Sequence, residues 1–395
     1  CGFSLCVASM TPRDPLVIDG KIAEWIDSDE KLRELLATRD VHADYALDTE
    51  FIAGQAYFTE LSLVQIAWPD CVGLIDPYLV DLTQLRPLFE GEGRALLHAA
   101  AGDLELLEIA VGLRPSRLFD TQIAGQFLGL STPSLAHLVQ RYCNVALDKS
   151  FQRTDWTVRP LPDPVRHYAA SDVAYLHRIV ELMSNELIER GRLKWVEIEN
   201  EIARTLPVPS RTPEELWWRL PRATSIPPSR QFGAQRLAML RDVRARGRNR
   251  PPSHILQDDA VVALASKPPR SISEFHKVKG CGNIPEPFAH EILRLLADSV
   301  ESSPGDLRRL PHSGVPSDIE PLVNVLLAVA NQRAIDSEID PKLLATRKDI
   351  SDVVLHQPSR LDDGWRVDLI TADIRLILDG HAAIAIEGNR LVVQR

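Results

Sequence analysis

Cysteine is scarce in this chain of 395 residues. Its five cysteines are Cys1, Cys6, Cys71, Cys143 and Cys281. None of them has Cys-x-x-Cys spacing, and an odd, scattered set fits neither a zinc site nor a disulfide framework. We therefore expect a protein of a reducing compartment, the cytoplasm.

Long apolar runs are missing as well. No stretch approaches the roughly 18–20 apolar residues that a membrane-spanning helix needs, so we expect no membrane association. The opening CGFSLCVAS is apolar but short and lacks a basic flank, which argues against a signal peptide. We expect Met10 to be the natural start, with residues 1–9 lying upstream of it. A GxxxxGK[ST] phosphate-binding loop is also absent, which excludes a helicase motor within this sequence.

The charge and composition limit the classes of protein that remain. The formal net charge of −10 opposes nucleic-acid binding by bulk electrostatics alone. An acidic protein can still act on a polyanion where its carboxylates hold metal cations. With 45% hydrophobic and 25% charged residues, the chain is long enough for two or three globular domains.

The first half of the sequence alternates between strand and helix patterns. Strands are predicted at 42–51, 60–68, 71–77 and 94–100, and helices at 103–113, 118–129, 134–143 and 164–190. Three strands in meander order, followed by strand–helix alternation, predict an α/β domain in which helices flank a mixed sheet.

The second half is proline-rich and then helical. We predict a first domain at 10–200, a proline-rich connector at 201–228, and all-helical units at 229–302 and 316–395. The two helical units have a similar order of features. In each, an arginine-bearing helix is followed by a proline and then by a helix that begins with apolar and acidic residues, which suggests an internal repeat. The tail reads as a hairpin that turns near Gly388 and Asn389.

Acidic residues at three places in the first domain are candidates for a metal site. Asp48 and Glu50 lie at the end of a predicted strand and point to the same side, with Thr49 opposite. Asp103 begins a predicted helix, where it could simply cap the helix. Taken alone, an acidic strand end is most often a solvated one.

Tyr168 and Asp172 lie four residues apart on a predicted helix and therefore share one face. Alone, a packed tyrosine beside a surface aspartate is the ordinary interpretation. Together with the other acids, however, they make four carboxylates and a phenol, which suit Mg²⁺ or Mn²⁺ better than zinc. Two such ions about 3.5–4 Å apart can stabilise both oxygens of a phosphodiester cleavage, and a tyrosine can orient the attacking water.

Five segments resemble, in order, the successive motifs of the ribonuclease D family. They are LDTEF (47–51), HAAAGDLELL (98–107), FDTQIAGQFLG (119–129), LDKSFQRTDWTVRPLP (147–162) and HYAASDVAYL (167–176). The family comprises 3′→5′ exoribonucleases of the DEDD superfamily with tyrosine in the last motif, and the resemblance covers about residues 16–195. It implies a ribonuclease H-like fold and two divalent metal ions, Mg²⁺ or Mn²⁺. The implied ligands are Asp48, Glu50, Asp103 and Asp172, with Tyr168 positioning or activating the water.

The resemblance also implies residues on the substrate side. Phe51 and Leu106 would wedge against the terminal base or ribose, and Lys149 would contact the terminal phosphates. His98 is expected near the substrate, supporting Asp103 rather than binding metal. The sequence departs from the family pattern at Ala53 and Gly54, where a charged pair is usual, so substrate contacts there stay open.

Three further residues of the fourth motif have two interpretations. Trp156, Arg153 and Arg159 suit stacking on bases and phosphate contacts. Alternatively, Trp156 packs under the last helix and the arginines pair with acids such as Asp155.

Residues 229–250 are markedly basic, with seven arginines against one acid, Asp242. The segment 237–280 resembles an HRDC domain, although a valine stands where a tryptophan is frequent. The arginines are a solvated helix face or a phosphate-contacting surface. The RNA-binding candidates are Arg236, Arg241, Arg244, Arg246, Arg248 and Arg250. The last unit resembles a second, more divergent HRDC-like domain and is expected to pack on the enzyme or shape the RNA entrance.

The leading hypothesis is a monomeric, metal-dependent 3′→5′ exoribonuclease that releases 5′-mononucleotides from tRNA precursors and other small structured RNAs. A DNA 3′→5′ exonuclease of the same superfamily is the first alternative, because contacts to the 2′-hydroxyl are not visible in a sequence. The second is an inactive HRDC adaptor. The presence of all four acids and Tyr168 argues against that one.

Overall fold

The computed structural model describes residues 16–52, 54–148, 150–151, 154–207, 212–301, 306–310 and 315–395. The chain forms two compact units, the first of Cys1–Glu50, Leu61–Leu206 and Val315–Arg395, the second of Phe51–Glu60 and Pro207–Gly314. The expectation for residues 1–9 lies outside the described residues. Across the described ranges, no helix has the length and apolar character required to cross a membrane.

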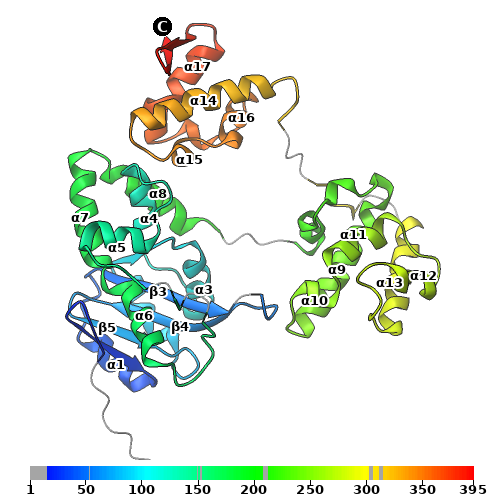
Figure 1. The fold of residues 1–395 in the computed structure, drawn as a ribbon, viewed down its shortest axis with the longest axis horizontal. Helices are drawn as coiled ribbons and strands as arrows, with labels where there is room; N and C mark the ends of the chain where they lie inside the picture. The colour runs from blue at the N-terminus through cyan, green and yellow to red at the C-terminus, as the bar shows by residue number, and fades with distance from the viewer. Residues whose placement is uncertain are drawn as a thin grey trace, which may run out of the picture. The chain divides into compact units, whose positions relative to one another are not determined.

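A seven-stranded mixed sheet is the centre of the first unit (Figure 1). Its strands are β1 (Leu16–Ile18), β2 (Lys21–Ile26), β3 (Tyr45–Ile52), β4 (Glu60–Ala67), β5 (Cys71–Ile75), β6 (Arg94–Leu97) and β7 (Arg117–Asp120). Their order is β1-β2-β5-β4-β3-β6-β7. The expected adjacency of β3, β4 and β5 is therefore confirmed, whereas the edge strand β1 and its neighbour β2 were not predicted.

Strands β3, β6 and β7 run parallel to one another. Ala46 pairs with Leu96 in one ladder, and Leu97 pairs with Asp120 in the next. Because parallel strands end at the same edge of a sheet, the residues that follow their carboxyl ends come together there. That edge receives the end of β3, the β6–α3 turn and Asp120.

Helices cover both faces of the sheet. One apolar core lies beneath α1 (Asp29–Ala37), η1 (Leu82–Leu85), α2 (Arg86–Glu90) and α3 (Ala101–Val111). The other lies beneath α4 (Thr121–Phe127), α5 (Leu135–Cys143), α6 (Asp163–Ala174) and α7 (Leu176–Glu189), with α8 (Leu193–Thr205) packed along β7. Strand β4 is buried on both faces because Leu63 faces one core and Val64 the other.

Two helix predictions in this domain need correction. The helix expected at 118–129 begins only at Thr121, because Arg117–Asp120 pairs with β6 as strand β7. A run of four residues is too short to have a measurable period, so its partner strand decides its conformation. The helix expected at 164–190 is divided into α6 and α7 at Tyr175.

A small helical bundle follows in the same unit. It contains α14 (Glu320–Asp336), α15 (Pro341–Leu344), α16 (Arg347–Val354), η6 (Arg360–Asp362), η7 (Val367–Thr371) and α17 (Ala372–Leu378). The chain then forms the hairpin β8 (Ala383–Glu387) and β9 (Arg390–Gln394). The turn falls at Gly388, which has a φ of +61°, as the sequence predicts.

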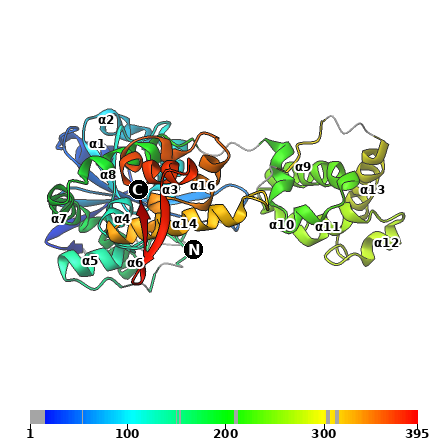
Figure 2. The same ribbon diagram turned by 90° about the horizontal axis from the view of Figure 1, so that it is seen from above.

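This C-terminal bundle shares its core with the sheet domain, beside α4 and α8 (Figures 1 and 2). Trp365 contacts Phe127 and Trp195, with ring centroids 5.0 and 5.3 Å away. Of the two roles expected for this segment, the structure shows the packing on the enzyme domain.

The same interface contains a buried ion pair. Arg366 donates through Nη1 and Nη2 to the two carboxylate oxygens of Glu199, at 2.6 and 3.0 Å, and the Trp365 indole N–H donates to the same carboxylate at 3.0 Å. A paired and hydrogen-bonded charge is the form in which carboxylate and guanidinium tolerate burial.

The second unit is helical, as predicted for 229–302. It contains η2 (Pro213–Arg219), η3 (Ala223–Ser225), η4 (Pro228–Arg230), α9 (Gln231–Gly247), α10 (Pro252–Ile255), α11 (Asp258–Ser266), α12 (Ile272–Lys277) and α13 (Glu286–Glu301). Its core gathers around Leu237, Phe275 and Ile292. Trp217, in the stretch expected to be a connector, is fully buried in this core and donates its indole N–H to the Arg308 carbonyl.

Candidate active site

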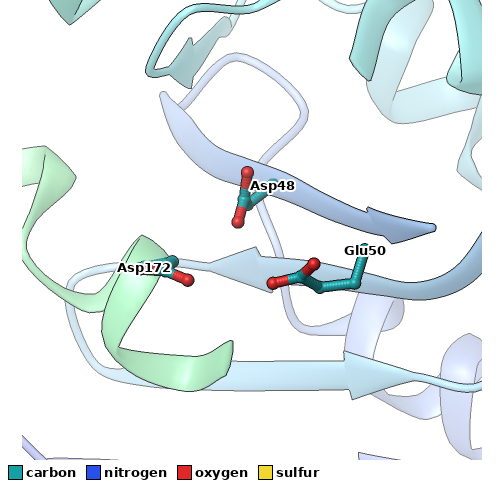
Figure 3. A group of neighbouring side chains, drawn as sticks. All are labelled: Asp48, Glu50 and Asp172. Carbon is teal, nitrogen blue, oxygen red and sulfur yellow. The ribbon is translucent and has the colours of Figure 1, made fainter. Parts of the chain in front are cut away.

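Three carboxylates meet above the sheet. Asp48 and Glu50 alternate along β3 and so project from the same face, and α6 brings Asp172 toward them. Ligand oxygens of all three residues lie within 4.8 Å of one another. Figure 3 shows these side chains, the carboxylate cluster, pointing toward a common centre.

The carboxylate cluster is electrostatically unfavourable without a positive partner. Burial raises the pKa of Asp48 well above its usual range, and the charges of Asp103, Asp172 and Glu50 add to that effect. Burial and the neighbouring Asp172 raise the pKa of Glu50 to about 8. Burial raises the pKa of Asp172 to about 7. Either protons or a cation must therefore compensate these groups, and a hard divalent ion fits an all-oxygen donor set.

Asp103 lies beside the carboxylate cluster rather than within it. It sits in the first turn of α3, is 8% exposed, and its Oδ1 accepts a hydrogen bond from the Thr49 hydroxyl at 2.5 Å. Burial raises its pKa to about 6, while the Thr49 hydrogen bond acts in the opposite direction. The structure thus brings three of the four predicted acids into one group and places the fourth at its border.

Tyr168 lies one turn before Asp172 on α6, on the same face, as the spacing predicts. Its ring packs against Phe151 and Trp156, with centroids 6.3 and 6.2 Å away. Burial and the Asp172 charge raise the pKa of the phenol above its usual range. At neutral pH the phenol therefore keeps its proton and acts as a hydrogen-bond donor.

Asp120 is a structural partner of the site to which sequence reasoning gave no role. It caps α4 by accepting from the Gln122 backbone N–H at 2.8 Å. Its carboxylate also accepts from the backbone N–H groups of Ala99 and Ala100 at 3.0 and 2.9 Å. Only the first of these contacts has a sequence signal, an aspartate between a strand and a helix.

His98 does not support Asp103 in the way expected. Its Nδ1 lies 2.9 Å from the Thr121 hydroxyl, which itself donates to the Leu97 carbonyl at 3.1 Å. Burial lowers the pKa of the ring, so His98 is neutral at pH 7. The observed partners of the ring are thus the Thr121 hydroxyl and the Pro133 backbone, not Asp103.

The predicted substrate-side residues have different surroundings. Phe51 is 37% exposed and available to a ligand, whereas Leu106 is 7% exposed and presents little of its side chain to a ligand. Lys149 and Arg153 lie outside the described residues.

The stacking prediction for Trp156 was wrong. This side chain is 2% exposed and packs against Tyr168, so neither face of its ring is open to a base. Arg159 forms an ion pair with the buried Asp76 at 2.6 Å and donates to the Ser62 carbonyl, also at 2.6 Å. The packing alternative is therefore the correct one for both residues.

The arginines of α9 also separate into two groups. Arg241 is 8% exposed and donates to Asp258 at 2.5 Å and to the Leu256 carbonyl at 3.1 Å, so it is a structural residue rather than a phosphate contact. Arg236 donates to Ser299 at 3.1 Å, and Arg244 pairs with Glu291. Arg246, Arg248 and Arg250 lie at the exposed end of the helix and in the turn that follows it. Arg246 also pairs with Asp242 at 3.5 Å and donates to the Tyr57 hydroxyl at 3.1 Å.

Comparison with known proteins agrees with this geometry. The family model for a 3′-5′ exonuclease matches residues 23–188, and that for an HRDC domain matches 234–296. Fold and site together define a 3′→5′ exonuclease with an attached HRDC domain.

Full-length relatives narrow the class further. The ribonuclease D of Jannaschia sp. is 31% identical over 380 residues, covering 88% of this chain and 93% of the relative. That of Zymomonas mobilis is 30% identical, covering 91% and 95%. The crystal structure of Escherichia coli RNase D superposes with a TM-score of 0.81 at 25% identity, covering 91% of this chain and 99% of that one. The chain belongs to the ribonuclease D family, which confirms the resemblance of its five motifs.

Proposed function

We propose that this protein is a metal-dependent 3′→5′ exoribonuclease that trims the 3′ ends of tRNA precursors and other small structured RNAs. The observation that carries the proposal is the convergence of Asp48, Glu50 and Asp172 within 4.8 Å. The Escherichia coli relative is described as an exoribonuclease involved in structured RNA processing, which supports the substrate class. We expect a cytoplasmic monomer.

The proposed metal ligands are the carboxylate cluster and Asp103. Their raised pKa values mark a donor set that binds a divalent cation in place of protons. Mg²⁺ or Mn²⁺, two ions in the proposal, would stabilise charge on the attacking and leaving oxygens when bound.

The protein's own groups then account for orientation and proton movement. The neutral Tyr168 phenol, one turn from Asp172, holds the attacking water beside the terminal phosphate. The water oxygen bonds to phosphorus while the bond to the preceding nucleotide's O3′ breaks. The attacking water gives up one proton and the departing O3′ takes one, which leaves a shortened RNA and a 5′-mononucleotide. Phe51 is exposed next to Glu50 and would meet the terminal nucleotide.

End-labelled RNA and DNA of the same sequence, with Mg²⁺ or Mn²⁺, test this function. Wild type should shorten RNA stepwise from its 3′ end, and Asp172→Asn should not. Asp163→Asn, on the exposed first turn of the same helix, is the matched control and should retain activity. Preferential shortening of DNA would support the DNA exonuclease, and no metal-dependent shortening of either polymer would favour the inactive adaptor.

A further inference from the structure

A side chain of strand β3, Thr49, holds the carboxylate of Asp103. Thr49 stands between Asp48 and Glu50 but points to the opposite face of β3, where it is buried. Its hydroxyl donates to Asp103 Oδ1 at 2.5 Å, across 54 positions of sequence. A strand position of this kind accepts valine as readily as threonine, so the hydroxyl needs another explanation.

The backbone that carries Asp103 is held from the other side. Helix α3 begins after Ala100, which provides no side-chain cap. Asp120, at the end of the neighbouring strand β7, instead accepts from the N–H groups of Ala99 and Ala100, the two residues before the helix. Ala99 has a φ of +59°, a left-handed conformation that a residue with a Cβ rarely adopts without support. One carboxylate therefore fixes the turn from which Asp103 projects.

We infer that Thr49 and Asp120 are positioning residues that fix the carboxylate of Asp103 at the border of the carboxylate cluster. Thr49 orients the carboxylate directly, and Asp120 fixes the backbone that bears it. The inference rests on the proposed function, in which Asp103 is a metal ligand. Groups that orient a ligand without touching the metal typically change metal affinity or activity 10–100-fold when they are removed.

The test compares Thr49→Val with Thr49→Ser in the full-length protein. Mn²⁺ binding is measured by calorimetry without RNA, and kcat and KM are measured on a labelled RNA. Of the two Mn²⁺ binding steps, the one with lower affinity should lose about 10–100-fold in affinity in Thr49→Val. The same substitution should lower kcat by a similar factor and leave KM within about twofold of the wild-type value. Thr49→Ser keeps the hydroxyl and should stay within about threefold of wild type.

Thr371→Val is the matched control. Thr371 is also a buried threonine, whose hydroxyl donates to the Leu361 carbonyl at 2.5 Å in the C-terminal bundle. This variant should lower the melting temperature and leave Mn²⁺ affinity unchanged. Wild-type Mn²⁺ binding in Thr49→Val, or an equal loss of affinity in Thr371→Val, would overturn the inference.

Asp103→Asn separates this inference from the proposed function. If Asp103→Asn alone leaves Mn²⁺ binding intact, the metal role of Asp103 fails, and the inference fails with it. If Asp103→Asn weakens binding and Thr49→Val does not, only the positioning role fails. In the Asp103→Asn background, Thr49→Val should cost no further affinity, because its effect passes through Asp103.

Asp120→Asn tests the backbone half of the inference. The amide offers one acceptor oxygen where the carboxylate offers two, so at least one of its backbone N–H partners loses its hydrogen bond. Mn²⁺ affinity should fall in the same direction as in Thr49→Val, and the loss should again vanish in the Asp103→Asn background. A loss that persists there would show a general structural effect and contradict the positioning role.

Discussion

The indole of Trp365 lies 5.3 Å from that of Trp195, with the two ring planes inclined by 19°. The first tryptophan belongs to the C-terminal bundle and the second to α8 of the sheet domain. This stacking, together with the Arg366–Glu199 pair beside it, makes the bundle a part of the catalytic unit.

Glu199→Gln should destabilise the protein by about 3–5 kcal/mol, because it leaves the buried Arg366 guanidinium without its counter-charge. Urea unfolding measures the change. The control is Lys348→Met, which breaks an ion pair whose lysine side chain is 81% exposed and should cost at most about 1 kcal/mol. Equal effects of the two substitutions would contradict a stabilising role of the buried pair at this interface.

The metal-free protein should lose stability as the pH rises through the titration of the carboxylate cluster. Asp172 and Glu50 keep their protons to about pH 7 and 8 when folded but release them near pH 4 when unfolded. Between these pH values the folded state therefore binds more protons than the unfolded state. As the pH rises through this range, each group lowers the free energy of unfolding by up to about 1.4 kcal/mol per pH unit.

The clearest measurement is the difference in unfolding free energy between wild type and Asp172→Asn, in EDTA from pH 5 to 8.5. The variant, which lacks one titrating carboxyl, should gain stability relative to wild type as the pH rises. Saturating Mg²⁺ should reverse that trend, because the cation takes the place of the protons. A pH-independent difference in EDTA would contradict the raised pKa of Asp172.

Tyr168→Phe should lower kcat about 100-fold and change KM little, because it removes only the hydroxyl that holds the water. Single-turnover cleavage of a labelled RNA measures this effect. Since the phenol has a raised pKa, wild-type activity should not fall between pH 8 and 9.5 through its ionisation. Tyr142→Phe, on α5, provides a control with unchanged cleavage.

Replacing Arg246, Arg248 and Arg250 together with alanine should weaken binding of long structured RNA and leave hydrolysis of short single strands intact. The slope of the logarithm of the RNA-binding constant against the logarithm of the salt concentration should decrease in magnitude by about 2. Each RNA phosphate that an arginine no longer neutralises accounts for about 0.7 of this decrease. The control replaces Arg347, Arg375 and Arg390 of the C-terminal bundle, which, like Arg246, pair with acids. An equal weakening of RNA binding in that variant would indicate a bulk charge effect.

The features that the sequence predicts best are those that depend on the spacing of residues within one strand or helix. Alternation along β3 placed Asp48 and Glu50 on one face, and helical spacing placed Tyr168 above Asp172, both confirmed by the geometry. The Thr49–Asp103 hydrogen bond is different, because it joins residues 54 positions apart and depends on where α3 meets the sheet. No local pattern signals it.

Other predictions were wrong because the residue types concerned suit packing and ligand recognition equally well. A tryptophan beside arginines suits base stacking, but the same side chain fills a core, and only burial distinguished the two for Trp156. Arg241 looked like its neighbours on a basic helix until the structure paired it with Asp258. Short strands such as β1 and β7 gain their conformation from their partners, so their own residues carry too little signal.

The shared core of the sheet domain and the C-terminal bundle has a consequence for biosynthesis. Trp195 is translated about 170 residues before Trp365, the ring that covers it, and ribosomes add about 5–20 residues per second. The apolar side chains of α4 and α8 therefore spend about 10–30 seconds on the nascent chain without their partner. A ribosome that stalls within this interval would carry a nuclease domain whose apolar interface with the C-terminal bundle is still exposed. Chaperones bind exposed apolar surface of this kind.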